Sequence, residues 1–352
     1  MYGSYNNNSY QYYDIQAETK KTEARSVFSR CHLALFFYLL IASAIAVIVQ
    51  IVLMLTLAGA DFDALFDNVY FVWLLNLAPM YLVALPVFYL ITKGMDIRVR
   101  EKRKMSAVEF LLIFLICQAA LAVGNSIGTS VVSIIEFMTG RVIESGTIEL
   151  IESTPLWLIF IVVVVVGPIV EEFIFRKILI DRFSKFGDLL AIIVSSVSFG
   201  LIHGNLSQMF YAALLGMVLG YVYTKTGNFW YNTALHMMIN FFGAFLSKIF
   251  LDIEAYIEEA TLALESGLPF DTTKYLRSAM ALGSYTAIQT AMVIGGFVVF
   301  FIARSKKKIQ LTHENNYQLP LKKGLSAAYL NVGTVLYLAL SFVTIALSTI
   351  LG

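Results

Sequence analysis

Residues 156–180 read LWLIFIVVVVVGPIVEEFIFRKILI, and this stretch decides the fold. Its first fifteen residues are almost pure hydrocarbon and run directly into Glu171, Glu172 and Arg176. A helix of this length and hydrophobicity crosses the ~30 Å hydrocarbon core of a bilayer. Because a charged group in that core costs at least ~2.5–3.5 kcal/mol, each of the three needs a partner or a purpose.

The composition of the whole chain is that of an integral membrane protein. The 352 residues are 59% hydrophobic and 14% charged, with a mean hydropathy of +0.76, whereas soluble domains are about 45–50% apolar. The formal net charge of +1 gives no general attraction for nucleic acid, so we expect no nucleic-acid partner. Cys31 and Cys117 lie in or beside apolar runs and match no metal or redox spacing.

Apolar runs of spanning length recur from residue 32 to the end. We predict an all-α, polytopic transmembrane bundle with nine spans at 32–59, 69–92, 107–137, 155–182, 188–204, 207–225, 228–250, 280–303 and 327–351. In an eight-span alternative, 188–204 or 207–225 is re-entrant. The polar, Asn- and Tyr-rich residues 1–31 are expected to form a disordered cytosolic tail, and residues 32–351 the transmembrane domain.

The charges of the connecting loops predict the direction of each span. Lys and Arg dominate at 93–107, 176–185, 225 and 304–323, which places these segments inside. The loops at 60–68, 138–154 and 251–279 are acidic, which places them outside. Nine spans then alternate consistently, with the N-terminus cytosolic. We therefore expect a multi-pass protein of the lipid bilayer, located in a bacterial plasma membrane.

Polar side chains recur at helical spacing in two later spans. The fifth span ends SSVSFGLIHG, with Phe199 and His203 four residues apart. The seventh contains NFWYNTALHMMINFFG, with His236 and Asn240 on one face. At 1.5 Å per residue, Glu171, His203 and His236 lie roughly 16, 22 and 12 Å from the inner boundary, so all three are predicted inside the membrane.

The other two histidines have simpler explanations. His32 lies at the entrance of the first span and His313 in the basic final loop, and solvation accounts for both. Neither is a candidate for the site.

The fourth span has two local features that bear on a site. Glu172 and Arg176 stand four residues apart and can pair, whereas Glu171 points roughly 100° away toward a cavity. Gly167-Pro168 precedes the glutamates, and Pro168 cannot bond the carbonyl of Val164. The resulting kink is expected to open an intramembrane cavity.

Two chemical schemes fit these residues. Glu171, His203 and His236 could ligate a divalent metal such as zinc, with water in the open position. Without metal, a carboxylate and an imidazole could deprotonate a water while the second imidazole and the Asn240 amide stabilise an oxyanion. Both schemes give hydrolysis by activated water, and both remain open at this stage.

The three motifs together resemble those of a known family. Glu171-Glu172-x-x-x-Arg176, Phe199-x-x-x-His203 and His236-x-x-x-Asn240 are similar, in this order, to the motifs of the CAAX protease and bacteriocin-processing (CPBP, or Abi) family. These are intramembrane proteases that include the type II CAAX prenyl protease. The resemblance covers residues 155–245 as a catalytic core.

The resemblance also implies a role for each motif residue. It makes Glu171 the water-activating acid, assisted by His203. His236 and Asn240 become ligands or oxyanion donors, and Glu172 and Arg176 orienting groups.

We therefore expect an intramembrane endopeptidase that acts on a hydrophobic peptide or a membrane-anchored protein. Prenylated CAAX peptides are one substrate class that the resemblance implies; a bacterial source favours bacteriocin leaders or membrane-anchored regulators. One alternative function is a secondary transporter or proton-coupled carrier with Glu and His at the midplane. Another is a non-catalytic bacteriocin immunity protein.

Overall fold

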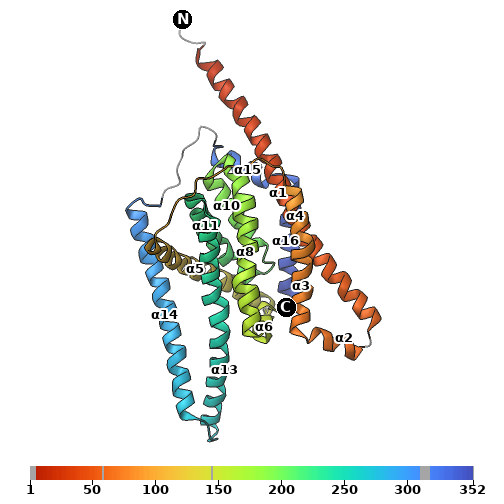
Figure 1. Ribbon diagram of the computed structural model, residues 1–352, viewed down its shortest axis with the longest axis vertical. Coiled ribbons are helices and arrows are strands. Elements are labelled where there is room, and N and C mark those ends of the chain that lie inside the picture. Colours follow the sequence, from red (N-terminus) through yellow and green to blue (C-terminus); the bar gives the residue numbers. More distant parts are fainter. Residues whose placement is uncertain (1–4, 58, 144–145, 310–317, 352) are drawn as a thin grey trace. The chain divides into compact units, whose positions relative to one another are not determined.

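The computed structural model describes residues 5–57, 59–143, 146–309 and 318–351. Within these ranges every regular element is a helix, which confirms the all-α prediction (Figure 1). Eight helical stretches in the described ranges are long and apolar enough to cross a membrane. The multi-pass prediction of eight or nine spans is therefore confirmed.

The eight candidate spans follow the predicted pattern. They are Ala17–Thr56, Val69–Thr92, Ala107–Thr139, Leu156–Phe186, Leu206–Thr226, Phe229–Glu265, Thr272–Ser305 and Val332–Ile350. The remaining predicted span, 188–204, corresponds to the 14-residue helix α10 (Asp188–Leu201). Fourteen residues extend about 21 Å, which is shorter than the hydrocarbon core.

The chain divides into two compact units, each assembled from separate stretches of sequence. Unit 1 holds Met1–Arg100, Ile174–Met209 and Leu311–Gly352, and unit 2 holds Glu101–Phe173 and Phe210–Gln310. The division falls inside the predicted core 155–245. Each unit therefore carries part of the three motifs.

The helices of unit 1 come from both ends and the middle of the chain. They are α1 (Tyr5–Thr56), α2 (Gly59–Phe66), α3 (Val69–Ala78), η1 (Pro79–Ala84), α4 (Leu85–Thr92), most of η3 (Phe173–Ile180), α9 (Asp181–Phe183), η4 (Ser184–Phe186), α10, α15 (Leu321–Tyr329) and α16 (Val332–Leu351).

The helices of unit 2 include α13 and α14, which run side by side in Figure 1. They are α5 (Ala107–Thr139), α6 (Gly146–Ser153), α7 (Leu156–Ile159), η2 (Phe160–Val166), α8 (Gly167–Glu172), most of α11 (Leu206–Thr226), α12 (Phe229–Asn240), η5 (Phe241–Phe245), α13 (Leu246–Glu265) and α14 (Thr272–Ser305).

The disordered tail expected over residues 1–31 is wrong from residue 5 onward, because α1 begins at Tyr5. Residues 1–4 lie outside the described residues. Ala24, Phe28 and Cys31 are fully buried and recur at helical spacing on one face of α1. The Phe28 ring packs on Phe183, with centroids 4.5 Å apart. This short apolar stripe, hidden among polar residues, gives the segment a packed surface.

His32 is buried, whereas solvation was expected to account for it. It is 1% exposed. Its Nε2 lies 3.0 Å from Ser198 Oγ on α10, and its Nδ1 lies 2.9 Å from Thr334 Oγ1 on α16 and from the Phe28 carbonyl oxygen. Buried polar groups persist where they have hydrogen-bond partners. This imidazole therefore ties α1, α10 and α16 together within unit 1.

We expect His32→Ala to lower the unfolding temperature of the full-length protein in detergent. The change removes partners from Ser198 and Thr334 and deletes a buried ring, which together cost about 2–4 kcal/mol. Scanning fluorimetry measures the shift. The control is Thr56→Val, because the exposed Thr56 hydroxyl bonds carbonyls of its own helix. Equal shifts in both variants would contradict a bridging role for His32.

The short helix α10 runs beside α16 in the same direction. The Tyr337 hydroxyl donates to the Ser198 carbonyl at 2.7 Å, and the Ser348 hydroxyl donates to the Gly204 carbonyl at 3.0 Å. The turn after α10, which contains His203, therefore lies near the C-terminal end of α16. Gly204 has φ of +67°, a left-handed conformation that glycine adopts without strain.

Four helix ends meet at one end of unit 2. The Arg103 amide donates to the Thr226 carbonyl at 2.7 Å, and the Met105 amide donates to the Tyr231 hydroxyl at 3.2 Å. The Tyr221 hydroxyl donates to the Lys308 carbonyl at 3.3 Å. The basic residues predicted to be inside at 102–104, 225 and 306–308 thus share one end. Which side of the membrane it faces stays a prediction.

Small residues allow close helix packing in unit 2. A Cβ atom on Gly296 of α14 would lie 2.0 Å from the Leu115 carbonyl oxygen of α5. A Cβ on Gly124 of α5 would lie 2.3 Å from the Cα of Tyr211 on α11. Membrane helices use such positions because direct backbone contact supplies the packing energy that lipid cannot. These contacts hold α14 and α11 against α5.

Candidate active site

The two adjacent glutamates end α8, in the middle of the fourth predicted span. The helix changes register here: α7 is followed by the π-helix η2, then by α8 and by the π-helix η3. π-Helical segments are often found at functional sites. A Cβ on Gly167 would lie 3.2 Å from the Val162 carbonyl oxygen and 3.8 Å from Glu171 Oε1. A side chain at this position would therefore press on the Val162 carbonyl and would be in ordinary contact with Glu171.

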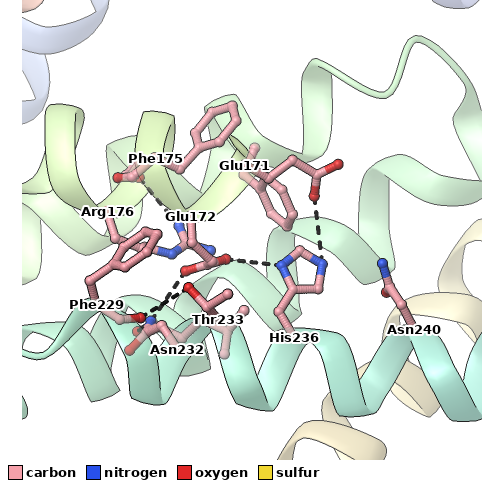
Figure 2. A network of polar contacts seen from close by, with 12 residues as sticks. Glu171, Glu172, Phe175, Arg176, Phe229, Asn232, Thr233, His236 and Asn240 are labelled. Atoms are coloured by element: carbon pink, nitrogen blue, oxygen red, sulfur yellow. Dashed lines mark hydrogen bonds and ion pairs between the residues drawn. The ribbon is translucent and has the colours of Figure 1, made fainter. Parts of the chain in front are cut away.

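His236 lies between the two carboxylates (Figure 2). Its Nδ1 is 3.0 Å from Glu172 Oε1, and its Nε2 is 3.5 Å from Glu171 Oε2. The side chains of His236 and Glu172 are 4% and 0% exposed, whereas that of Glu171 is 31% exposed. The structure therefore brings together three of the predicted site residues and gives only Glu171 substantial access to solvent or substrate.

Asn232 is a fourth member of the cluster that the sequence analysis missed. Its Nδ2 donates to Glu172 Oε2 at 3.3 Å and to the Leu219 carbonyl at 2.6 Å. Both carboxylate oxygens of Glu172 thus have a hydrogen-bond partner: Oε1 has His236 and Oε2 has Asn232. Asn232 stands four residues before His236 and so shares its helix face. This spacing is the signal that could have found it.

Asn240 shares the same face of α12 and contacts the backbone of η2. Its Nδ2 donates to the Val163 carbonyl at 2.8 Å. A bond to the backbone differs from the predicted roles of ligand or oxyanion donor. Those roles stay predictions.

Arg176 and His203 belong to unit 1. Arg176 is fully buried, its Nη1 donates to Ser195 Oγ at 3.4 Å, and its guanidinium carbon lies 5.1 Å from the centroid of the Phe199 ring. The pairing of Arg176 with Glu172 stays a prediction. Both its burial and its contacts agree with an orienting group rather than a solvated cation.

Phe199 positions His203 by two contacts within unit 1. The Phe199 carbonyl lies 2.8 Å from His203 Nδ1, and the two rings stand edge to face with centroids 5.0 Å apart. When Nδ1 donates a hydrogen bond to that carbonyl, Nε2 of the neutral ring carries the lone pair that a general base requires. The joint action of His203 with Glu171 stays a prediction.

The contacts of His236 define its chemistry. The buried Glu172 carboxylate accepts the Nδ1 proton, which turns the Nε2 of a neutral ring toward Glu171. Nε2 lies 3.5 Å from Glu171 Oε2, so a proton can pass between the two groups. This pair can exchange a proton with a reacting molecule.

Unit 2 contains two of the three predicted metal ligands, Glu171 and His236. His236 uses Nδ1 for Glu172, so Nε2 and the Glu171 carboxylate are the donors that remain to them. Among the described residues, no group of three or more His, Cys, Asp and Glu side chains could hold a metal ion, and catalytic zinc takes three protein ligands. His203 belongs to unit 1, so the predicted ligand set of Glu171, His203 and His236 stays a prediction.

Comparison with known proteins finds a similarity across the region that contains this site. Residues 153–242 match the family model for "Type II CAAX prenyl endopeptidase Rce1-like". The chain is also similar to "Putative membrane peptidase YdiL" of Bacillus subtilis (strain 168), with 34% identity over 109 residues. That match covers 30% of this chain and 44% of the relative, so the chain spans less than half of the relative's length. No solved structure matches the chain.

The matched region contains all three motifs, from Glu171 to Asn240. The resemblance to the CAAX protease family is therefore confirmed over this region.

Proposed function

We propose that this chain is a membrane peptidase whose water-activating group is Glu171; the match of residues 153–242 to the Rce1-like CAAX endopeptidase family model supports the peptidase class. The observation that carries the proposal is the array in which the His236 ring contacts Glu171 through Nε2 and Glu172 through Nδ1 (Figure 2). One carboxylate in it is accessible and the other is buried. This asymmetry assigns different tasks to two chemically identical groups.

The proposed reaction uses Glu171 as the general base. Its carboxylate takes a proton from water, and the water oxygen bonds to the carbonyl carbon of the scissile peptide. The same proton then passes across the 3.5 Å gap to His236 Nε2 and on to the leaving nitrogen as the C–N bond breaks. Glu172 keeps the Nδ1 proton in place and stabilises the imidazolium during this transfer.

The proposed substrate is a hydrophobic peptide or a membrane-anchored protein. The candidate spans around the site would bring such a chain to the depth of Glu171. The family name suggests prenylated peptides, whereas the name of the Bacillus subtilis relative, a putative membrane peptidase, specifies no modification. We favour the unmodified class, because the array of Glu171, His236 and Glu172 acts on the peptide bond itself.

The test is hydrolysis by the wild-type protein in proteoliposomes. A quenched hydrophobic peptide and its farnesylated form are supplied in ¹⁸O-enriched water, and products are identified by mass spectrometry. We expect cleavage of the unmodified peptide, with one solvent oxygen in the new carboxylate. Cleavage restricted to the farnesylated peptide would contradict the proposed substrate class.

Two further arms separate the alternatives. Proton or solute flux without cleavage would assign a carrier instead of a peptidase. A rate that survives chelator supports catalysis by the side chains alone, whereas a loss restored by zinc would support the predicted ligands Glu171, His203 and His236.

A further inference from the structure

We propose that Asn240 is a positioning residue that replaces a backbone hydrogen bond removed by Pro168. In this role its amide sets the register between α12, which carries His236, and the helix that carries Glu171 and Glu172. The inference rests on the proposed function for its catalytic consequence. Its structural part stands on the geometry of η2, α8 and α12 alone.

The first step is the hydrogen-bond register of η2. The Gly167 amide at its end donates to the Val162 carbonyl, five residues earlier. This is the π-helical pattern, in contrast to the four-residue step of an α-helix. The next bond in the same pattern would run from residue 168 to the carbonyl of Val163.

Residue 168 is a proline and has no amide proton. The π-register therefore ends at Gly167 and leaves the Val163 carbonyl without its helical donor. An α-helical step of four residues would instead have left the Val164 carbonyl without its donor. The one-residue difference follows from the wider π-turn.

The second step is the donor that replaces it. Asn240 Nδ2 lies 2.8 Å from the Val163 carbonyl oxygen, which is a normal amide–carbonyl distance. In a hydrocarbon environment a backbone carbonyl without a partner costs several kcal/mol. A side chain from a neighbouring helix is one of the few groups that can supply the missing donor.

The third step is the position of this bond relative to the site. Asn232, His236 and Asn240 recur every four residues on one face of α12. They contact, in reverse order along the other helix, Glu172, then Glu171 and Glu172, then Val163. The Asn240 bond is the far end of this antiparallel ladder. It therefore fixes how far α12 can slide along the glutamate-bearing helix.

The experiment is a double-mutant cycle of Asn240→Ala and Pro168→Ala. Alone, Asn240→Ala should lower the unfolding temperature by about 2–4 °C and kcat by about 10- to 100-fold, because Glu171 and His236 lose their mutual register. Pro168→Ala restores an amide proton beside Val163. We expect the double variant to recover most of both losses, with KM little changed throughout.

The control pairs Asn240→Ala with Pro155→Ala, since Pro155 begins the same helical stretch but lies outside the π-register. This pair should show no recovery. Additive effects of Asn240→Ala and Pro168→Ala would overturn the proposal, and would favour direct contact of Asn240 with substrate. Unfolding is measured without substrate. The cycle therefore tests the hydrogen bond from Asn240 to the Val163 carbonyl even if the wild type lacks peptidase activity.

Discussion

Glu171→Gln should reduce the rate of peptide hydrolysis by at least about 10³-fold while leaving the folded protein unchanged. The amide keeps the shape of the side chain but cannot accept a proton from water, so the general-base step and its relay are both lost. Glu171 is 31% exposed, and its contact to His236 spans 3.5 Å. The substitution is therefore expected to leave no closely bound group without its hydrogen-bond partner.

The measurement is kcat and KM with the quenched peptide, together with the unfolding temperature. The matched control is Glu109→Gln, also in unit 2. Glu109 accepts from the Ser106 amide and hydroxyl in a capping box, and a glutamine oxygen can still accept there. Glu109→Gln should keep full activity. More than a tenth of the wild-type rate in Glu171→Gln would remove Glu171 from the role of base.

The approach of His236 to Glu171 could be anticipated from the sequence because membrane depth restricts the choices, whereas Glu172 was expected to pair with Arg176 and not with His236. A carboxylate or an imidazole in hydrocarbon needs a polar partner, and few other ionisable residues in the predicted spans can supply one. Helical spacing then placed His236 and Asn240 on one face. The all-α architecture followed from the same apolar runs.

Asn232 and Pro168 show what the sequence did not predict. Asn232 is neutral and stands in a polar stretch near the start of α12, so neither charge nor depth marked it. Its importance depends on Glu172, 60 residues away, being within hydrogen-bond reach. The π-register of η2 has no sequence marker comparable to a cap. Only the helix geometry therefore shows that the carbonyl left without a donor is that of Val163 and not that of Val164.

His32 and α1 were misjudged for a related reason. The apolar stripe that buries Ala24, Phe28 and Cys31 is only a few residues wide, and the polar composition of the segment dominates any average over it. His32 then stands next to that stripe rather than at an open entrance. The hydrogen-bond partners of His32 are Ser198 on α10 and Thr334 on α16. Both lie far from His32 in the sequence, so the residues next to His32 do not predict them.

Glu172→Gln should lower kcat by about 10²–10⁴-fold and also destabilise the protein. Glu172 is fully buried and accepts hydrogen bonds from two donors, His236 Nδ1 and Asn232 Nδ2. A glutamine has one carbonyl oxygen, so its NH2 group must face one of those donors. An unpaired buried donor costs about 1–3 kcal/mol. If the proton of His236 moves to Nε2 in response, the nitrogen that faces Glu171 can no longer accept a proton.

The comparison that isolates this effect is with Glu136→Gln. Glu136 accepts one backbone amide, that of Ile143, and a glutamine oxygen meets that need. Glu136→Gln should therefore leave both kcat and the unfolding temperature near wild type.

A cycle with His236→Ala then separates orientation from simple loss of charge. If Glu172 acts through the imidazole, Glu172→Gln should cost little further rate once His236 is alanine, because the group that it orients is gone. If the two losses multiply instead, Glu172 acts on the reaction independently of His236. The division of labour between the accessible and the buried carboxylate would then be wrong, even with Glu171 remaining the base.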